Sequence, residues 1–85
     1  MDIHEMVKKI ESREDLIEFL EALMVDVREN RAEWNGNDKL DYFLDGVSGW
    51  LANLDGWCEN RNIPVPEQPT WQLVGQMFMA GKYFS

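Results

Sequence analysis

Residues 38–59 read DKLDYFLDGVSGWLANLDGWCE, and this stretch decides the fold. Its apolar side chains recur at three- and four-residue steps, whereas its acidic side chains fall on the opposite side of a helix. The apolar stripe comprises Leu40, Phe43, Leu44, Val47, Trp50, Leu51, Leu54 and Trp57, and the polar stripe comprises Asp38, Asp41, Asp45, Ser48, Asp55 and Glu59. The pattern predicts one long amphipathic helix over residues 38–60.

Helical spacing also appears on both sides of this stretch. A short helix is expected over residues 2–10, and a second helix over residues 13–30 with Ser12 as its N-cap. The second helix has an apolar stripe of Leu16, Ile17, Leu20, Leu23, Met24 and Val27. A last helix is expected over residues 70–83, capped by Thr70, after a proline-rich connector over residues 63–69.

These elements predict an all-α fold in a single domain over residues 1–85. The expected architecture is a small irregular antiparallel bundle of three main helices plus the short N-terminal helix. The last helix carries almost no charge, which suggests that it is buried on more than one side. Asn35-Gly36 signals a turn, after which Asn37 or Asp38 is expected to cap the long helix, and Trp34 is expected to fold back onto the core.

Three glycines in the long helix, Gly46, Gly49 and Gly56, each disfavour a helix by about 1 kcal/mol relative to alanine. Two interpretations are open. Gly49, Asn53 and Gly56 lie within about 60° of one another on a helical wheel, so they can form a small-residue strip that another backbone approaches closely. Alternatively, Gly56 bends or interrupts the helix before Trp57.

The charge of the chain limits its partners. Eight Lys and Arg residues oppose sixteen Asp and Glu residues, giving a formal net charge of −8, which is the wrong sign for a direct nucleic-acid binder. Cys58 is the only cysteine, so a disulfide within one chain is impossible and a cytoplasmic location is expected. No apolar run approaches the length of a membrane span. The chain is expected to be a monomer or a homodimer.

The residues of known catalytic sites are mostly missing. The chain has one histidine, His4, and one cysteine, so neither a hydrolytic triad nor a zinc site is expected. Neither a phosphate-binding loop nor the Glu-x-x-His pairs of a di-iron bundle are present. The sequence therefore predicts a protein that is not an enzyme and needs no metal or other cofactor.

Several short motifs, spread from Ser12 to Tyr83, together resemble a known family. They are SREDLIEFL at residues 12–20, EWN at 33–35, Leu40 with YFL at 42–44, WL at 50–51, and PTW at 69–71 before Tyr83. The family consists of short bacterial proteins described only as a domain of unknown function. This chain departs from its pattern in having Gly46 and Gly49. The resemblance implies a small helical bacterial protein and supplies no catalytic residues.

The main functional hypothesis is a non-enzymatic acidic module that binds a basic surface of a partner protein, as an inhibitor or an immunity-type protein does. The predicted contact residues are Asp38, Asp41, Asp45, Asp55 and Glu59, with Tyr42 as an aromatic anchor. One alternative is a small-molecule or metal-binding domain that uses Asp41 and Asp45 or a tryptophan-lined pocket. Another is a structural protein with no dedicated site.

Overall fold

The computed structural model describes residues 2–84, and within them it contains helices and no strand. The helices are α1 (Ile3–Lys8), α2 (Arg13–Glu29), the short 3₁₀ helix η1 (Arg31–Trp34), α3 (Leu40–Ala52), α4 (Leu54–Asn60) and α5 (Trp71–Tyr83). The predicted all-α class is confirmed.

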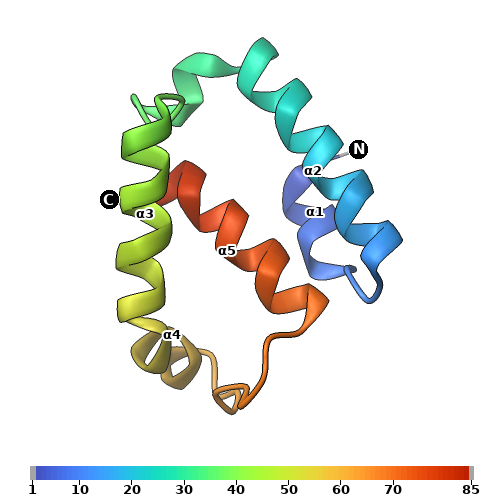
Figure 1. Cartoon of the computed structure of the whole chain (residues 1–85), viewed down its shortest axis with the longest axis vertical. Coiled ribbons are helices and arrows are strands. Elements are labelled where there is room, and N and C mark those ends of the chain that lie inside the picture. The colour runs from blue at the N-terminus through green and yellow to red at the C-terminus, as the bar shows by residue number, and fades with distance from the viewer. Residues whose placement is uncertain (1, 85) are drawn as a thin grey trace.

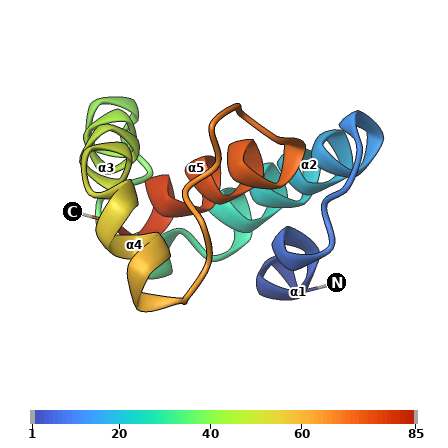
Figure 2. The same ribbon diagram turned by 90° about the horizontal axis from the view of Figure 1, so that it is seen from below.

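The last helix of the chain lies at the centre of the molecule (Figure 1). α3 packs along one side of α5, while α1 and α2 pack along the other, so α2 and α3 contact α5 far more than they contact each other. Figure 2 shows α3, α5 and α2 in one row, with α1 and α4 on the same side of that row. This central position explains why α5 carries so little charge, since a helix enclosed by neighbours loses the solvent that would stabilise ions.

Local sequence signals set the beginnings of two helices. The Ser12 hydroxyl accepts a hydrogen bond from the Asp15 amide at 3.1 Å, and the Thr70 hydroxyl accepts one from the Leu73 amide at 3.0 Å. Both N-caps are therefore formed as predicted. The cap expected for α3 is wrong: Lys39 occupies that position and makes no side-chain capping bond.

The candidate caps of α3 are engaged elsewhere. The Asn37 amide group donates a hydrogen bond to the Lys82 carbonyl at 2.9 Å, and the Asp38 carboxylate pairs with Arg31 at 2.8 Å. A long-range hydrogen bond therefore engages Asn37, and an ion pair with a nearby residue engages Asp38, so neither side chain caps α3.

The predicted helix over residues 38–60 is wrong as a single element, because it is broken at Asn53 into α3 and α4. The Asn53 backbone leaves helical geometry at φ −108° and ψ 19°. Its side-chain amide donates to the Gly49 carbonyl at 3.0 Å, a local bond that competes with regular helix. The break brings the rings of Trp50 and Trp57 to 5.3 Å between centroids, whereas residues seven apart in a straight helix are separated by about 10 Å along the axis.

The core lies where α1, α2 and η1 meet α5. It contains Ile3, Val7, Ile10, Leu16, Phe19, Leu23, Trp34 and Met79, so Trp34 folds onto the core as expected. Two expectations are wrong. Phe19, absent from the predicted stripe of α2, is fully buried, while Ile17 and Met24 are exposed. On α3, the predicted apolar residues Leu40, Leu44 and Leu51 are also exposed.

These differences have one geometric cause. The apolar stripes of α2 and α3 are each wide enough to be buried by two neighbouring helices. In the structure α5 packs against one side of each helix and covers only part of its stripe. The remaining part of each stripe stays in solvent.

Close approach of α3 and α5 occurs at two of the three glycines. A Cβ atom on Gly46 would lie 2.5 Å from the carbonyl oxygen of Phe84, and one on Gly49 would lie 2.8 Å from the Phe84 ring. A Cβ on Gly56 would meet nothing within 4 Å. Gly46 and Gly49 therefore mark close packing, Gly56 does not, and the break falls at Asn53.

Candidate functional site

Five of the six predicted contact residues are exposed. Asp41, Tyr42 and Asp45 lie on α3, and Asp55 and Glu59 lie on α4. The sixth, Asp38, is different: its carboxylate is paired with Arg31 and only 18% of the side chain is exposed. Asp38 is thus already neutralised within the molecule.

The break at Asn53 divides the predicted acidic stripe. Asp41 and Asp45 are one turn apart on α3 and share a face of that helix. Asp55 and Glu59 share a face of α4, which follows a different axis. The Lys39 ammonium lies 5.9 Å from the centroid of the Tyr42 ring. The structure therefore offers two short acidic patches, with Tyr42 and Lys39 beside the first.

The tryptophans line a small hollow, which is the tryptophan-lined pocket considered as an alternative. Its volume is about 250 Å³, and Trp50, Trp57 and Arg61 of the α3–α4 region face Met79, Ala80 and Tyr83 of α5 across it. Trp50 is buried, and the Arg61 guanidinium lies 4.1 Å from the Trp57 ring centroid. The ring of each tryptophan is therefore already in contact with other protein groups. This arrangement favours a packing role for the pair.

A buried lysine, which the sequence analysis did not single out, organises a second site. Lys82 in the last turn of α5 is only 2% exposed, and its ammonium donates to Asp26 at 2.7 Å and to Glu33 at 3.3 Å. Asp26 also accepts hydrogen bonds from the Trp34 indole and the Asn30 amide, both at 3.0 Å. One carboxylate of α2 thus connects η1 with α5.

The pairing fixes the ionisation of both groups. Burial by itself raises the pKa of Asp26, but hydrogen bonds from Lys82, Asn30 and Trp34 outweigh burial and hold that pKa below its ordinary value of 3.8. Burial by itself lowers the pKa of Lys82, but the hydrogen bond to Asp26 and the neighbouring Tyr83 raise it above 10.5. Both groups are therefore charged at neutral pH.

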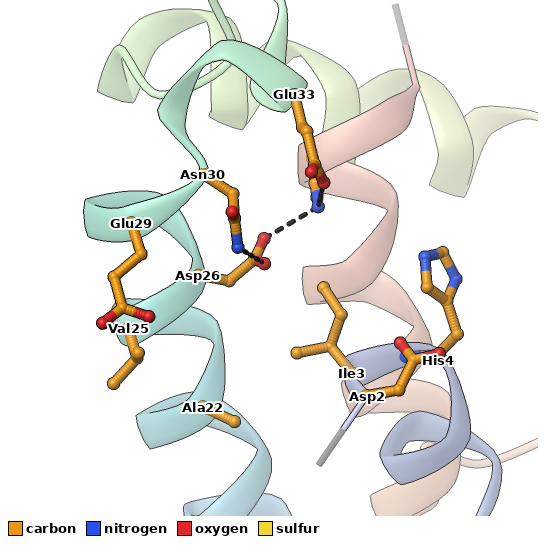
Figure 3. Close-up of a pocket in the computed structure, with 10 residues that line it drawn as sticks. Asp2, Ile3, His4, Ala22, Val25, Asp26, Glu29, Asn30 and Glu33 are labelled. Atoms are coloured by element: carbon orange, nitrogen blue, oxygen red, sulfur yellow. Dashed lines mark hydrogen bonds and ion pairs between the residues drawn. The ribbon is translucent and has the colours of Figure 1, made fainter.

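An open pocket of about 570 Å³ lies beside this pair (Figure 3). Asp26, Glu29, Asn30 and Glu33 line one wall, and Asp2, Ile3 and His4 of the α1 region line the other. His4 forms a 3.0 Å hydrogen bond with the Tyr83 hydroxyl. A protonated ammonium has no lone pair, so Lys82 is not placed to act as a nucleophile or general base here. The geometry makes Lys82 and Asp26 a structural ion pair.

A faint signal for Lys82 does exist in the sequence. It is the only basic residue between residues 63 and 85, in a segment that is otherwise almost uncharged. It also follows Gly75 and Met79 at seven- and three-residue spacing, which places it on their side of the helix. That pattern predicts a buried charge that needs a partner, although it does not say which carboxylate supplies one.

The described part of the chain contains neither a metal-binding cluster nor a membrane-spanning helix. Within residues 2–84, no three His, Cys, Asp or Glu side chains converge so as to hold a metal ion. None of the helices in this range is both long enough and apolar enough to cross a bilayer.

Comparison with known proteins identifies the family of the chain. Neither the curated proteins nor the solved structures gave a match. The model of one protein family, described as a family of unknown function (DUF7660), matches residues 12–85. The match begins at the N-cap of α2 and includes α2 to α5, so it covers both acidic patches and the Lys82–Asp26 pair. The chain therefore belongs to the DUF7660 family of unknown function.

Proposed function

We propose that this chain is a non-enzymatic interaction module that binds a basic surface of a partner protein through the acidic side chains of α3. The observation that carries the proposal is the state of Asp41 and Asp45. Both are exposed and one turn apart, and neither forms an ion pair within residues 2–84. In contrast, Asp26 and Asp38 have internal cationic partners.

The remaining features agree with a binding role. Two potentially reactive groups are engaged or covered, since the Cys58 thiol is buried and the Lys82 ammonium is paired. The net charge of −8 speeds encounter with a basic partner and repels acidic ones. Asp55 and Glu59 of α4 extend the same attraction along the neighbouring helix. We place this interaction in the cytoplasm.

Capture from a lysate of the native cell tests the proposal. The purified chain serves as bait at low and at high salt, and mass spectrometry identifies what it retains. We expect a basic protein that is retained at low salt and lost at high salt, because exposed charges are screened by ions.

A pair of variants gives the control. Asp41→Lys with Asp45→Lys should abolish capture, whereas Glu14→Lys with Glu18→Lys makes the same charge change one turn apart on exposed α2 positions and should leave capture of that protein largely intact. Capture that survives reversal of Asp41 and Asp45 would contradict the proposal.

A further inference from the structure

An apolar surface lies where α2 approaches the start of α3, and no residue of α1 or α4 lines its groove. Its centre is a groove of about 320 Å³ between α2 and the start of α3. Leu20, Met24 and Val27 form the α2 wall, Leu40 forms the α3 wall, and Trp34 and Phe43 also line it. The only polar residues in the lining are Asn37 and Asp38.

The groove lies opposite the pocket beside Lys82. On α2 that pocket is lined by Ala22, Val25 and Asp26, which fall on a different side of the helix from Leu20, Met24 and Val27. Ile3 and His4 of α1 line the pocket, and no residue of α1 lines the groove. In Figure 2, α1 and α4 lie on one side of the row formed by α3, α5 and α2. Within residues 2–84, no helix covers the groove side.

Each wall of the groove continues as a stripe of apolar side chains, of which Leu40, Leu44 and Leu51 on α3 and Ile17 and Met24 on α2 are exposed, whereas Val47, Leu20 and Val27 are half-buried. On α3, Leu40, Leu44, Val47 and Leu51 follow one another at steps of four, three and four residues, and Leu40 is 71% exposed. On α2, Ile17, Leu20, Met24 and Val27 follow at steps of three, four and three. This spacing is the one by which an α-helix presents an apolar seam to another helix. The α3 stripe extends about 16 Å, which is three helical turns.

Acidic side chains lie beside both apolar stripes, and on α2 the exposed Arg28 lies there as well. On a helical wheel Asp41 and Asp45 come directly after the α3 leucines, on the side away from α5, and Glu21 borders Met24 on α2. A second copy of the chain would bring these like charges together, each copy carrying a net charge of −8. These acidic side chains therefore disfavour self-pairing at neutral pH and favour a segment with an apolar seam and basic flanks.

We propose that this groove binds a basic amphipathic α-helix of a partner protein. The apolar seam of that helix lies between the α2 and α3 stripes, and its Lys or Arg side chains pair with Asp41, Asp45 and Glu21. This inference rests on the proposed function and specifies the partner. The acidic residues attract a basic segment, and the groove binds its apolar side.

A synthetic helix tests the inference without the native partner. The probe is a fluorescent peptide of about four helical turns, with leucines at heptad positions and lysines beside them. One control peptide has the same composition in an order that disperses the leucines, and another has glutamates in place of the lysines. Fluorescence anisotropy should show binding of the first peptide and at least tenfold weaker binding of both controls.

Paired variants locate the binding surface. Met24→Ser with Leu40→Ser removes apolar area from the groove walls, and we expect at least tenfold weaker binding. Ile63→Ser with Val65→Ser makes the same kind of change at exposed positions of the connector, and binding should stay within twofold of the unmodified chain. Amide chemical shifts of the unmodified chain with peptide should move along α2 and α3, which tests the site without any variant.

The outcomes separate the two proposals. If Asp41→Lys with Asp45→Lys weakens binding but Met24→Ser with Leu40→Ser does not, the groove assignment fails and the acidic module survives. If neither pair weakens binding, both proposals fail. Equal binding of the dispersed-leucine peptide would also overturn the groove. A dimer at neutral pH that Met24→Ser with Leu40→Ser dissociates would assign the surface to a second copy instead.

Discussion

Lys82 lies where α5 meets α2 and η1. Because its ammonium is buried away from water, the stability of the fold depends on the carboxylates that pair with it. The ammonium is held by Asp26 of α2 at 2.7 Å and by Glu33 of η1 at 3.3 Å. Asp26 is mostly buried and accepts two further hydrogen bonds, whereas 62% of the Glu33 side chain is exposed. Solvent weakens an exposed pair, so Asp26 should supply most of the compensation for the buried charge.

Replacing each carboxylate in turn tests this asymmetry. Asp26→Asn should lower the free energy of unfolding by about 3 kcal/mol, because the buried Lys82 charge then keeps only the exposed Glu33 carboxylate as its ionic partner. Glu33→Gln should lower it by less than about 1 kcal/mol. Urea unfolding monitored by circular dichroism measures both. Equal losses for the two variants would show that the pairing is shared evenly.

The same carboxylate predicts the acid response. A folded-state pKa below the ordinary 3.8 means that Asp26 contributes stability that is fully present above that value and is lost as pH falls through the folded pKa. The urea midpoint of the unmodified chain should therefore fall more steeply below pH 3.8 than that of Asp26→Asn. Parallel curves would mean that other carboxylates govern acid unfolding. At the alkaline end the raised pKa of Lys82 has the opposite sign: its stabilisation is lost as pH rises above 10.5.

Among the elements, α3 shows what local sequence can and cannot specify. The N-caps at Ser12 and Thr70 and the burial of Trp50 follow from signals close in sequence. The end of α3 could not be predicted in this way. Asn53 ends the helix because its side chain turns back to donate to the Gly49 carbonyl, and the sequence does not show that it will do so. The start of α3 was not predicted correctly for a related reason, since Asn37 donates a hydrogen bond to the Lys82 carbonyl and Asp38 pairs with Arg31.

The glycines of this region give a matched pair of substitutions. Gly46→Ala should destabilise the fold by about 1–3 kcal/mol, because its methyl group meets the Phe84 carbonyl oxygen across the α3–α5 contact. Gly56→Ala should stabilise it by up to about 1 kcal/mol, because the space beside it is open and alanine favours a helix. Thermal unfolding compares the two. A stabilising Gly46→Ala would mean that α3 and α5 do not approach as closely as described.

At the scale of the whole molecule, the position of α5 determines which parts of the predicted site are correct. Exposure of Asp41, Tyr42, Asp45, Asp55 and Glu59 followed from amphipathic spacing alone. The exposed leucines and the buried Lys82 did not, since both depend on which side of α2 and α3 the last helix occupies. Periodicity identifies an apolar side but does not give the number of neighbours that cover it. Long-range contacts made by α5 therefore distinguish core from surface here.

Net charge and the uncovered apolar groove together predict how the free chain behaves. At neutral pH the charge of −8 should hold copies apart and keep the chain monomeric. Near the isoelectric point of about 4.4 this repulsion disappears, while the Lys82–Asp26 pair, with its lowered carboxyl pKa, still holds the fold. Sedimentation velocity should then show association at pH 4.4 and none at neutral pH.

Substitution should show which surface associates. Met24→Ser with Leu40→Ser should suppress association near the isoelectric point, and Ile63→Ser with Val65→Ser should not. Equal association of the two variants would mean that the groove is not the adhesive surface. If only the groove variant loses self-association, the groove is the surface through which copies associate. Acidic charge then keeps this surface free at neutral pH, where it can bind a basic helix.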